Sequence, residues 1–376
     1  MIATYSIISL LLTGLYLLVL CYLIKGWASL KTPRVNPSGF TTKVTVLIAA
    51  RNEEESIHLT IGDILAQDYP KELTEIIIVD DHSTDRTAEI IRSYANQAVK
   101  LLQMNEDKPL NSYKKKAISE AIALSSGELM VATDADCRMG SKWLSTIVGY
   151  YEAENPVMIS SPVGYFQERS LFELMQTVEF SYLIGVGASF IGNKRASTCN
   201  GANFAYRKDV FYEVGGFKGI DDLASGDDEL LLQKVAQRFP GRIGFTKLPE
   251  AVVYTHAKHS LSGFLQQRKR WASKSTRYKD KKIVALAVGI WLYNVGLLTS
   301  SVLSFFYADI FKLLLLQLAF KMAFEALFLT PIMRFFKRPG LLLLTPLVSS
   351  AHVIYIAYIG LISNNSKYAW KGRMVR

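Results

Sequence analysis

Three long apolar segments without a formal charge constrain the fold of this chain more than any other feature. They cover residues 2–24 near the N-terminus, and residues 283–308 and 340–362 in the C-terminal third. Each segment is long enough to cross a bilayer as a helix, which takes about 20 apolar residues. Half of the 376 residues are apolar, so neither a disordered tail nor a small disulfide scaffold fits this composition. We expect a globular domain tethered to a membrane.

The first segment is predicted to remain as a transmembrane anchor over residues 1–25. It has no basic stretch before it and no small-residue cleavage site of the kind that ends a signal peptide. Lys25, Lys31 and Arg34 follow it, and such basic residues favour the cytosolic side of a span. After a linker over residues 26–39, the soluble domain is therefore expected in the cytosol, in a multi-pass protein of the cell (inner) membrane.

The C-terminal segments over residues 281–363 allow two arrangements, with two or three spans. Residues 313–333 are apolar but contain Lys321 and Glu325, which could pair one helical turn apart. If these residues span, the basic tail over residues 364–376 lies outside the cell. If they lie in the interface or re-enter, the tail returns to the cytosol, and both arrangements stay open.

Residues 40–280 alternate β-rich runs with helical patterns, which predicts an α/β domain. Strands are expected at residues 44–50, 75–79, 99–103 and 129–133, and helices at residues 56–67, 85–91 and 114–124. Strands joined by helices in this order form a Rossmann-like, mostly parallel, doubly wound sheet. Such a sheet binds its ligands beyond the carboxyl ends of its strands.

Acidic residues follow three of the predicted strands, namely Glu53, Asp80 with Asp81, and Asp134 with Asp136. We expect these side chains to converge in one crevice, where the first and fourth strands are neighbours. Their joint charge calls for Mg²⁺ or Mn²⁺, which prefers oxygen ligands and leaves positions open for phosphate oxygens. The competing interpretation is that each is a turn former or helix cap, which we prefer for Asp85. Glycine-rich phosphate loops and C-x-x-C zinc spacings are absent from the sequence.

Several motifs occur in a fixed order along this region. They are VTVLIAARNEEESI, EIIIVDDHSTD, YKKKAISEAI, LMVATDADCRM, CNGANFAYRKDVFYEVGGF, SGDDELLL and QRKRW. Together they resemble the family 2 inverting glycosyltransferases, and among these the membrane-bound Q-x-x-R-W type of cellulose synthase, poly-N-acetylglucosamine synthase and ceramide glucosyltransferase. The resemblance covers residues 40–280 and implies a GT-A fold, with a nucleotide-sugar half over residues 40–140 and an acceptor half over residues 141–280.

The resemblance also implies roles for residues in the nucleotide-sugar half, with a UDP- or GDP-sugar as donor and Mg²⁺ or Mn²⁺ as cofactor. The implied donor contacts are Ala50, Arg51 and Glu53 at the base, Asp80 or Asp81 at the base or ribose, Lys114 and Arg270 at the diphosphate, and Asp134 on the nucleotide side. Asp136, with Asp134, would hold the metal. Tyr113 replaces a glycine of the family pattern, and Lys115 and Lys116 follow Lys114, so which lysine reaches the phosphate stays open.

A base is needed to deprotonate an acceptor hydroxyl during displacement at the anomeric carbon. Asp227 matches the aspartate of the family's Glu-Asp motif, with Asp228 as the second choice, although Gly226 stands where glutamate is often found. The competing interpretation is a capping box formed by Ser225 and Asp228 at the start of a helix. Both interpretations can hold at once.

The remaining predicted contacts belong to the acceptor side. The resemblance suggests that Asn200, Gly201 and Asn203 line the acceptor site, and that Gln267 and Trp271 contact acceptor sugars. Gln267, Arg270 and Trp271 would lie on one side of a helix, where arginine can grip a diphosphate and tryptophan can stack on a sugar. The neighbouring basic residues Lys274, Arg277, Lys279, Lys281 and Lys282 are assigned to anionic lipid rather than to nucleic acid, because a membrane span adjoins them.

The predicted function is therefore a membrane-bound, metal-dependent, inverting glycosyltransferase. Q-x-x-R-W favours a polysaccharide acceptor, whereas the few membrane segments favour a single addition to a polyprenyl phosphate or a glycolipid. A catalytically silent sugar-nucleotide scaffold of a synthase complex and a transporter are the alternatives outside this class. Two features stay open: residues 166–190 could pack in a core or lie at the bilayer surface, and His256 and His259 have no assigned role.

Overall fold

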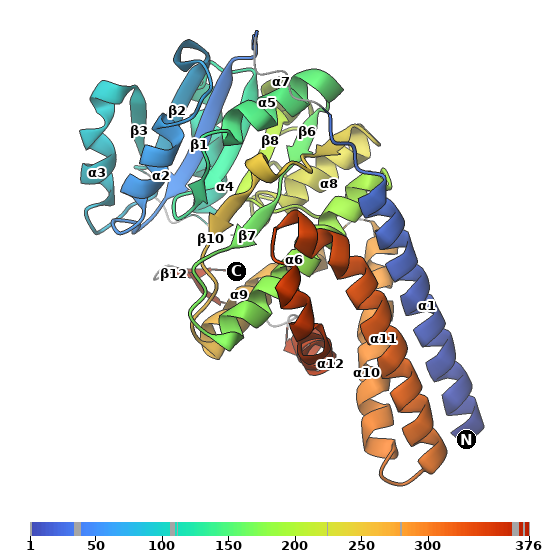
Figure 1. Ribbon diagram of the computed structural model, residues 1–376. Helices are drawn as coiled ribbons and strands as arrows, with labels where there is room; N and C mark the ends of the chain where they lie inside the picture. Colours follow the sequence, from blue (N-terminus) through green and yellow to red (C-terminus); the bar gives the residue numbers. More distant parts are fainter. Residues whose placement is uncertain are drawn as a thin grey trace. The chain divides into compact units, whose positions relative to one another are not determined.

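The computed structural model describes residues 2–33, 39–105, 110, 112–223, 225–278, 280–362, 368–370 and 373–375. Arg34, Lys279 and most of the basic tail over residues 364–376 lie outside the described residues. The chain divides into two compact units (Figure 1). We call them the α/β unit, which comprises Ser29–Gln167 and Phe190–His256, and the helical unit, which comprises Met1–Ala28, Glu168–Ser189 and Ala257–Ser366.

The α/β unit contains a seven-stranded sheet with the strand order β3-β2-β1-β4-β8-β6-β9. The strands are β1 (Val44–Ala50), β2 (Thr74–Asp80), β3 (Val99–Gln103), β4 (Leu129–Asp134), β6 (Met158–Ser160), β8 (Asn203–Arg207) and β9 (Ile243–Phe245). The first four strands in the chain pair in parallel, whereas β8 runs antiparallel to both β4 and β6. The predicted mostly parallel α/β fold and the adjacency of the first and fourth strands are confirmed.

Helices connect the parallel strands, as the sequence pattern predicts (Figure 1). The helices of this unit are α2 (Ile57–Leu65), α3 (Thr87–Ser93), α4 (Tyr113–Leu124), α5 (Trp143–Glu154), α7 (Lys208–Glu213) and α8 (Glu229–Arg238). A smaller sheet has the order β5-β10-β7, from β5 (Arg138–Met139), β7 (Val163–Tyr165) and β10 (Val253–Thr255). Two further short strands, β11 (Tyr368–Trp370) and β12 (Arg373–Val375), pair with each other.

Long apolar helices form most of the helical unit. They are α1 (Ile2–Ala28), α6 (Leu171–Gly192), α9 (Leu261–Ser273), α10 (Lys281–Leu303), α11 (Ala308–Phe335) and α12 (Thr345–Ile362), with a 3-10 turn over Pro339–Leu344 before α12. Helices α1, α10 and α11 lie side by side, and α12 packs against α10 and α11 (Figure 1). Among the described residues, five helical segments are long and apolar enough to cross a membrane: α1, α6, α10, α11 and Pro339–Ile362. These candidate spans indicate a membrane protein.

A buried ion pair interrupts the apolar surface of α11, as the spacing of its two residues predicts. Lys321 Nζ lies 2.6 Å from Glu325 Oε1, and the two side chains are 1% and 4% exposed. Tyr16 of α1 donates a hydrogen bond to the same carboxylate, and Lys321 Nζ lies 3.0 Å from Ser349 Oγ of α12. The pair therefore joins three helices that are far apart in the sequence.

The boundary between the units differs from the predicted domain boundary. Glu168–Ser189 and residues 257–280 were predicted to belong to the soluble domain, but they pack with the apolar helices. Their buried polar groups find partners within the helical unit, since Arg268 of α9 pairs with Glu179 of α6. Val178 of α6 packs in an apolar cluster with Leu329. Of the two interpretations of residues 166–190, the structure supports core packing.

We expect Lys321→Met to destabilise the helical unit by about 3–5 kcal/mol, because it leaves the Glu325 carboxylate buried without its ammonium partner. The double variant Lys321→Met/Glu325→Leu should recover most of this loss. Thermal unfolding in detergent micelles measures both. Lys312→Met is the matched control, because Lys312 forms an exposed pair with Asp309 on the same helix. A Lys321→Met midpoint equal to that of the control would contradict the assigned role.

Candidate active site

The carboxyl ends of β1, β2 and β4 form one edge of the large sheet. Ala50 pairs with Asp80 across the first two strands, and Ala49 pairs with Asp134 on the other side. Arg51 donates hydrogen bonds from Nη1 to the carbonyl oxygens of Asp81 and His82, at 2.7 and 2.9 Å. The predicted convergence of the strand ends is therefore present in the backbone.

The loops beyond these strand ends hold strained backbone. Asn52 and His82 have φ angles of 51° and 54°, in the left-handed region that non-glycine residues rarely adopt. Asp81 lies against His82, with 3.1 Å between Oδ1 and Nδ1, and both Asp80 and Asp81 are buried. Strain of this kind gathers where ligands bind. The predicted contacts of Asp80, Asp81 and Ala50 with a nucleotide stay predictions.

Lys114 at the start of α4 joins two candidate functional carboxylates. Its Nζ lies 2.8 Å from Oδ1 of Asp134 at the end of β4 and 3.2 Å from Oδ2 of Asp227. Burial alone would lower the pKa of Lys114, but the carboxylates of Asp134 and Asp227 outweigh it and raise the pKa well above its usual value. The lysine is therefore a fixed positive charge between the two aspartates.

Unsatisfied polar atoms surround this charge. Apart from the Lys114 ammonium, the buried Oδ2 of Asp227 has no polar partner within the described chain, and the buried hydroxyl of Tyr206 has no hydrogen-bond partner there. Buried polar atoms in native proteins are nearly always paired, with protein groups, water or ligand. The edge of the sheet near Asp227 thus has free hydrogen-bonding capacity for a bound molecule.

Asp227 and Asp228 have different environments although they are adjacent. Asp228 is the N-cap of α8, because its Oδ1 accepts from the N–H of Glu229 at 2.6 Å and its Oδ2 accepts from Gly201 at 2.8 Å. The predicted capping box was wrong, since Asp228 itself occupies the cap position assigned to Ser225. Gly226 has a φ of 84°, which explains why this chain has glycine where the family often has glutamate.

The structure separates the three consecutive lysines that the sequence left ambiguous. Only Lys114 faces the carboxylates of the strand edge. Lys115 is buried and donates to three backbone carbonyl groups, and Lys116 pairs with Glu120 on the surface of the helix. Lys114 is thus the lysine whose position suits the predicted diphosphate contact.

Asp134, Asp136 and Cys137 have ligand atoms within 4.8 Å of one another, and this group tests the predicted metal site. Cys137 is fully buried, and burial together with the two neighbouring carboxylates raises the pKa of its thiol. A protonated thiol is a poor ligand for a hard cation, whereas two carboxylates suit Mg²⁺ or Mn²⁺. The oxygen ligands therefore fit the predicted cofactor, with Cys137 outside the ligand set.

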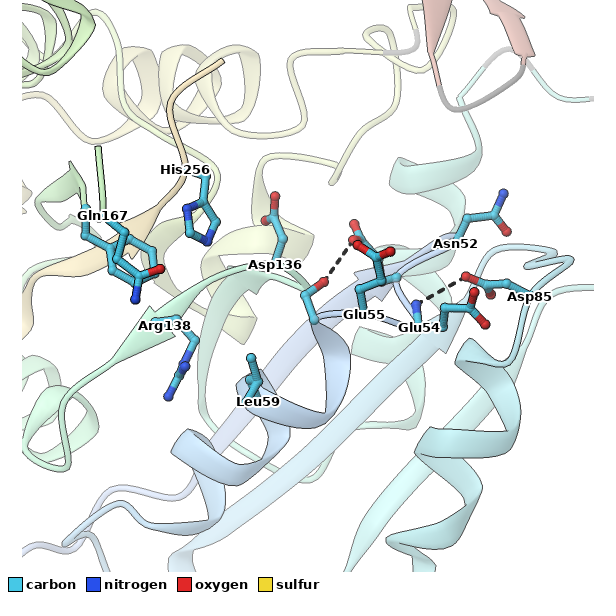
Figure 2. Close-up of a pocket in the computed structure, with 12 residues that line it drawn as sticks. Asn52, Glu54, Glu55, Leu59, Asp85, Asp136, Arg138, Gln167 and His256 are labelled. Carbon is cyan, nitrogen blue, oxygen red and sulfur yellow. Dashed lines mark hydrogen bonds between the residues drawn. The ribbon is translucent and has the colours of Figure 1, made fainter. Parts of the chain in front are cut away.

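A pocket of about 540 Å³ opens beside Asp136 (Figure 2). Asn52, Glu54, Glu55 and Asp85 lie on one side of it and Arg138, Gln167 and His256 on the other, with Asp136 between them (Figure 2). The His256 ring lies 4.5 Å from that of Phe166, which also lines the pocket. The sequence left His256 unassigned, because a lone histidine has no spacing signal. Glu53 lines this pocket, but Asp81 and Asp227 do not.

All three predicted acceptor residues at positions 200–203 make hydrogen bonds within the protein. Asn203 is fully buried, donates from Nδ2 to the carbonyl groups of Pro162 and Ala251, and accepts from Trp143 Nε1 at 3.0 Å. Its amide therefore has no capacity left for an acceptor sugar, and its role is to hold β8 in place. Gly201 donates its N–H to Asp228, where an added Cβ would lie 3.2 Å from Oδ2. Asn200 is half-buried, and its Oδ1 accepts a hydrogen bond from the N–H of Ala202 at 2.9 Å.

The Q-x-x-R-W residues lie on α9 in the helical unit, and a residue between them organises the motif. Arg268 stacks over the Trp271 ring at 4.2 Å and donates to Gln267 Oε1 at 2.6 Å, while it pairs with the buried Glu179. Arg270 lies on the same helix and is half-buried. Sequence reasoning missed Arg268, although its spacing from Phe264 and Trp271 places all three on one helix face.

Comparisons with known proteins agree with this geometry. Residues 45–215 match the model of glycosyl transferase family 2. Residues 45–215 are a glycosyltransferase family 2 domain. The match includes β1 to β4, the aspartates at their ends and Lys114, so the predicted family and enzyme class are confirmed.

Relatives of this glycosyltransferase include the probable glycosyltransferase YdaM of Bacillus subtilis, 30% identical over 255 residues, covering 65% of this chain and 57% of YdaM. The poly-beta-1,6-N-acetyl-D-glucosamine synthase of Staphylococcus epidermidis is 25% identical over 238 residues, covering 61% of this chain and 53% of the synthase. The chain thus spans little more than half the length of these curated relatives. Among solved structures, the mannosyltransferase PcManGT of Pyrobaculum calidifontis, in complex with GDP-Man and Mn²⁺, covers 93% of this chain and 99% of its own, with a TM-score of 0.62 and 19% identity. This likeness confirms the GT-A fold.

We expect Gly226→Ala to impair the site through backbone strain, because a Cβ in the left-handed region costs about 1–2 kcal/mol. The segment before Asp227 would relax and move that carboxylate away from Lys114. Gly62→Ala is the control, since Gly62 lies inside α2 with open space around it and alanine there is neutral or stabilising. Denaturant unfolding measures both changes, and equal midpoints for the two variants would contradict the strain argument.

Proposed function

We propose that this protein is a membrane-bound, inverting glycosyltransferase that transfers a sugar from a nucleoside-diphosphate donor to an acceptor hydroxyl. The observation that carries the proposal is the position of Lys114 between Asp134 and Asp227, 2.8 and 3.2 Å away. It brings the candidate donor-binding carboxylate and the candidate base to one place. The reaction requires both within a few ångströms of the anomeric carbon.

The donor side of the site is assigned to the strand edge. Arg51, Glu53 and the Asp80–Asp81 pair would border the base and ribose, as in the family pattern. The ammonium of Lys114 would bind the diphosphate. The diphosphate would then compete with the carboxylates of Asp134 and Asp227 for this ammonium. The neighbouring pocket has room for a sugar, and its carboxylates could accept hydrogen bonds from the sugar hydroxyl groups. The rings of Phe166 and His256 could pack against one face of the sugar ring.

Asp227 is the base that the geometry favours. The polar partner of its Oδ2 within the described chain is the Lys114 ammonium, and a bound diphosphate that attracts this ammonium would leave the oxygen available to an acceptor hydroxyl. Both oxygens of Asp228 already accept backbone N–H groups, which lowers its value as a proton acceptor. Asp227 would take the hydroxyl proton while the acceptor oxygen displaces the diphosphate with inversion.

The divalent cation is assigned to Asp134 and Asp136. When bound, Mg²⁺ or Mn²⁺ neutralises the diphosphate and makes it a better leaving group. The solved mannosyltransferase of the same fold was crystallised with Mn²⁺ and GDP-Man, which supports this choice of cofactor and donor class.

The acceptor is proposed to be a growing polysaccharide, since a relative with the matching domain is a poly-N-acetylglucosamine synthase. A lipid acceptor, either a polyprenyl phosphate or a glycolipid, is favoured by another observation. Of the five candidate spans, α6 has 67% of its apolar window buried inside the protein, which leaves few helices to enclose a polymer channel. We assign the α/β unit to the cytosol, at the inner membrane, because basic residues follow α1 and such residues favour the cytosolic side of a span.

Asp227→Asn should lower kcat by about 10²–10⁴-fold with little change in the donor KM, because the base is lost while the donor contacts remain. Transfer from radiolabelled donor in purified membranes measures both constants. Asp68→Asn is the control, because Asp68 is an exposed carboxylate three residues beyond the end of α2. Unchanged transfer by Asp227→Asn would contradict the role of Asp227 as the base. Donor binding without turnover in the wild type would favour a sugar-nucleotide-binding scaffold instead of an enzyme.

Incubation of membranes with a panel of UDP- and GDP-sugars plus Mn²⁺ tests donor, cofactor and acceptor together. We expect one donor to be consumed, chelation by EDTA to stop transfer, and Asp136→Asn to raise the Mn²⁺ concentration needed for half-maximal binding. A ladder of labelled oligomers indicates polymer synthesis, whereas one labelled sugar on an organic-soluble product indicates a lipid acceptor. Full activity in EDTA would contradict the assigned metal site.

A further inference from the structure

Lys115 is the most deeply buried charged side chain near the candidate active site. It lies on α4 next to Lys114, yet its side chain is 1% exposed. It occupies the apolar stripe of the helix, three residues before Ile118 and seven before Ile122, which are also buried. Placing an ammonium in such a stripe costs free energy unless all its donors are satisfied. The function described so far does not use this residue.

The donors of Lys115 are satisfied by one short segment of the chain. Its Nζ donates to the carbonyl oxygens of Ile220, Leu223 and Ser225, the last two at 2.7 and 2.8 Å. These three bonds equal the number of donors of an ammonium group, which leaves none for a carboxylate. We call the segment the base loop and define it as residues 219–223 and 225–227, since it ends at Asp227.

The base loop has little regular structure of its own. It lies between α7 and α8, and its glycines Gly219 and Gly226 have φ angles of 82° and 84°. Three carbonyl oxygens of this loop converge on one ammonium, that of Lys115. Asp227 follows two residues after the last carbonyl that Lys115 holds.

We propose that Lys115 is a positioning residue, which folds the base loop around its ammonium and so holds Asp227 in place for proton abstraction. The inference rests on the proposed function, in which Asp227 is the base. Lys114 and Lys115 then have complementary tasks on one helix turn. Lys114 contacts the Asp227 carboxylate directly, whereas Lys115 holds the backbone that carries it.

The electrostatic surroundings of Lys115 give the proposal a pH-dependent readout. Burial lowers the pKa of Lys115 to about 8, although the carboxylates of Asp227, Asp228, Asp222 and Asp221 oppose that shift. Above this pH the neutral amine donates fewer hydrogen bonds, and the base loop loosens. The pKa of Lys115 is higher in the unfolded chain than in the folded one, so its deprotonation does not lower global stability. Above this pH we therefore expect activity to fall while stability does not.

The test compares Lys115→Met with Lys116→Met, a matched control because Lys116 is a surface lysine of the same helix, paired with Glu120. We expect kcat of Lys115→Met to fall by about tenfold or more at a nearly constant donor KM, since small misplacements of a catalytic group are costly. Hydrogen exchange should show loss of protection at the amides of Ile220–Leu223 and Ser225–Asp227 and not in β1. Lys116→Met should match the wild type in both measurements.

The wild-type chain provides a second test that does not depend on the folding of a variant. Its kcat and its base-loop protection factors, corrected for intrinsic exchange, should decline together above pH about 8 while the unfolding midpoint does not. Retained kcat or retained loop protection in Lys115→Met overturns the proposal, as does a wild-type loop whose protection is constant to pH 9.5. If the base loop loosens in Lys115→Met but the wild type transfers no sugar, Lys115 still holds the loop, and the result contradicts the proposed function instead.

Discussion

Charge compensation at Lys114 is the interaction on which the candidate site depends. Asp134 and Asp227 come from distant parts of the chain, and two carboxylates so close together repel each other unless a cation lies between them. The ammonium of Lys114 compensates both negative charges, at 2.8 and 3.2 Å. A diphosphate that enters the site competes for the same ammonium, so donor binding and the availability of Asp227 are physically linked.

The fold supplies this geometry through the sheet and one helix. Parallel pairing of β1 with β2 and β4 aligns the strand ends, and the return of β8 antiparallel to β4 brings the Asn200–Asn203 loop and the cap of α8 to the same edge. Consecutive residues on a helix point about 100° apart. Lys114 and Lys115 therefore reach different targets from adjacent positions, one the carboxylates and the other the carbonyl groups of the base loop.

Local patterns predicted much of this arrangement. Buried β runs, helical spacing and acidic strand ends located β1 to β4, Asp134 and Asp136 from the sequence, whereas Asp227 was singled out by the resemblance to the glycosyltransferase family. They could not separate Lys114 from Lys115, although the spacing of Lys115 with Ile118 and Ile122 does mark it as a residue of the buried face. Nor could they show that the Asn203 amide is saturated by Pro162, Ala251 and Trp143, because those partners lie far away in the sequence. Patterns among neighbouring residues can be predicted from the sequence, whereas hydrogen bonds between residues far apart in the sequence depend on the assembled fold.

Buried charge pairs have a different task in the helical unit. Apolar helices gain little from association in a lipid environment, since lipid tails are as apolar as leucine, so polar contacts add direction to their packing. Lys321 and Glu325 join α11 to α1 and α12, and Arg268 joins α9 to α6 through Glu179. Arg268 also stacks on Trp271, so the pair that fixes the two helices fixes a Q-x-x-R-W side chain as well. Replacing such a pair with apolar residues would preserve hydrophobicity and lose the rotational register of the helices, which is the property that orients the motif.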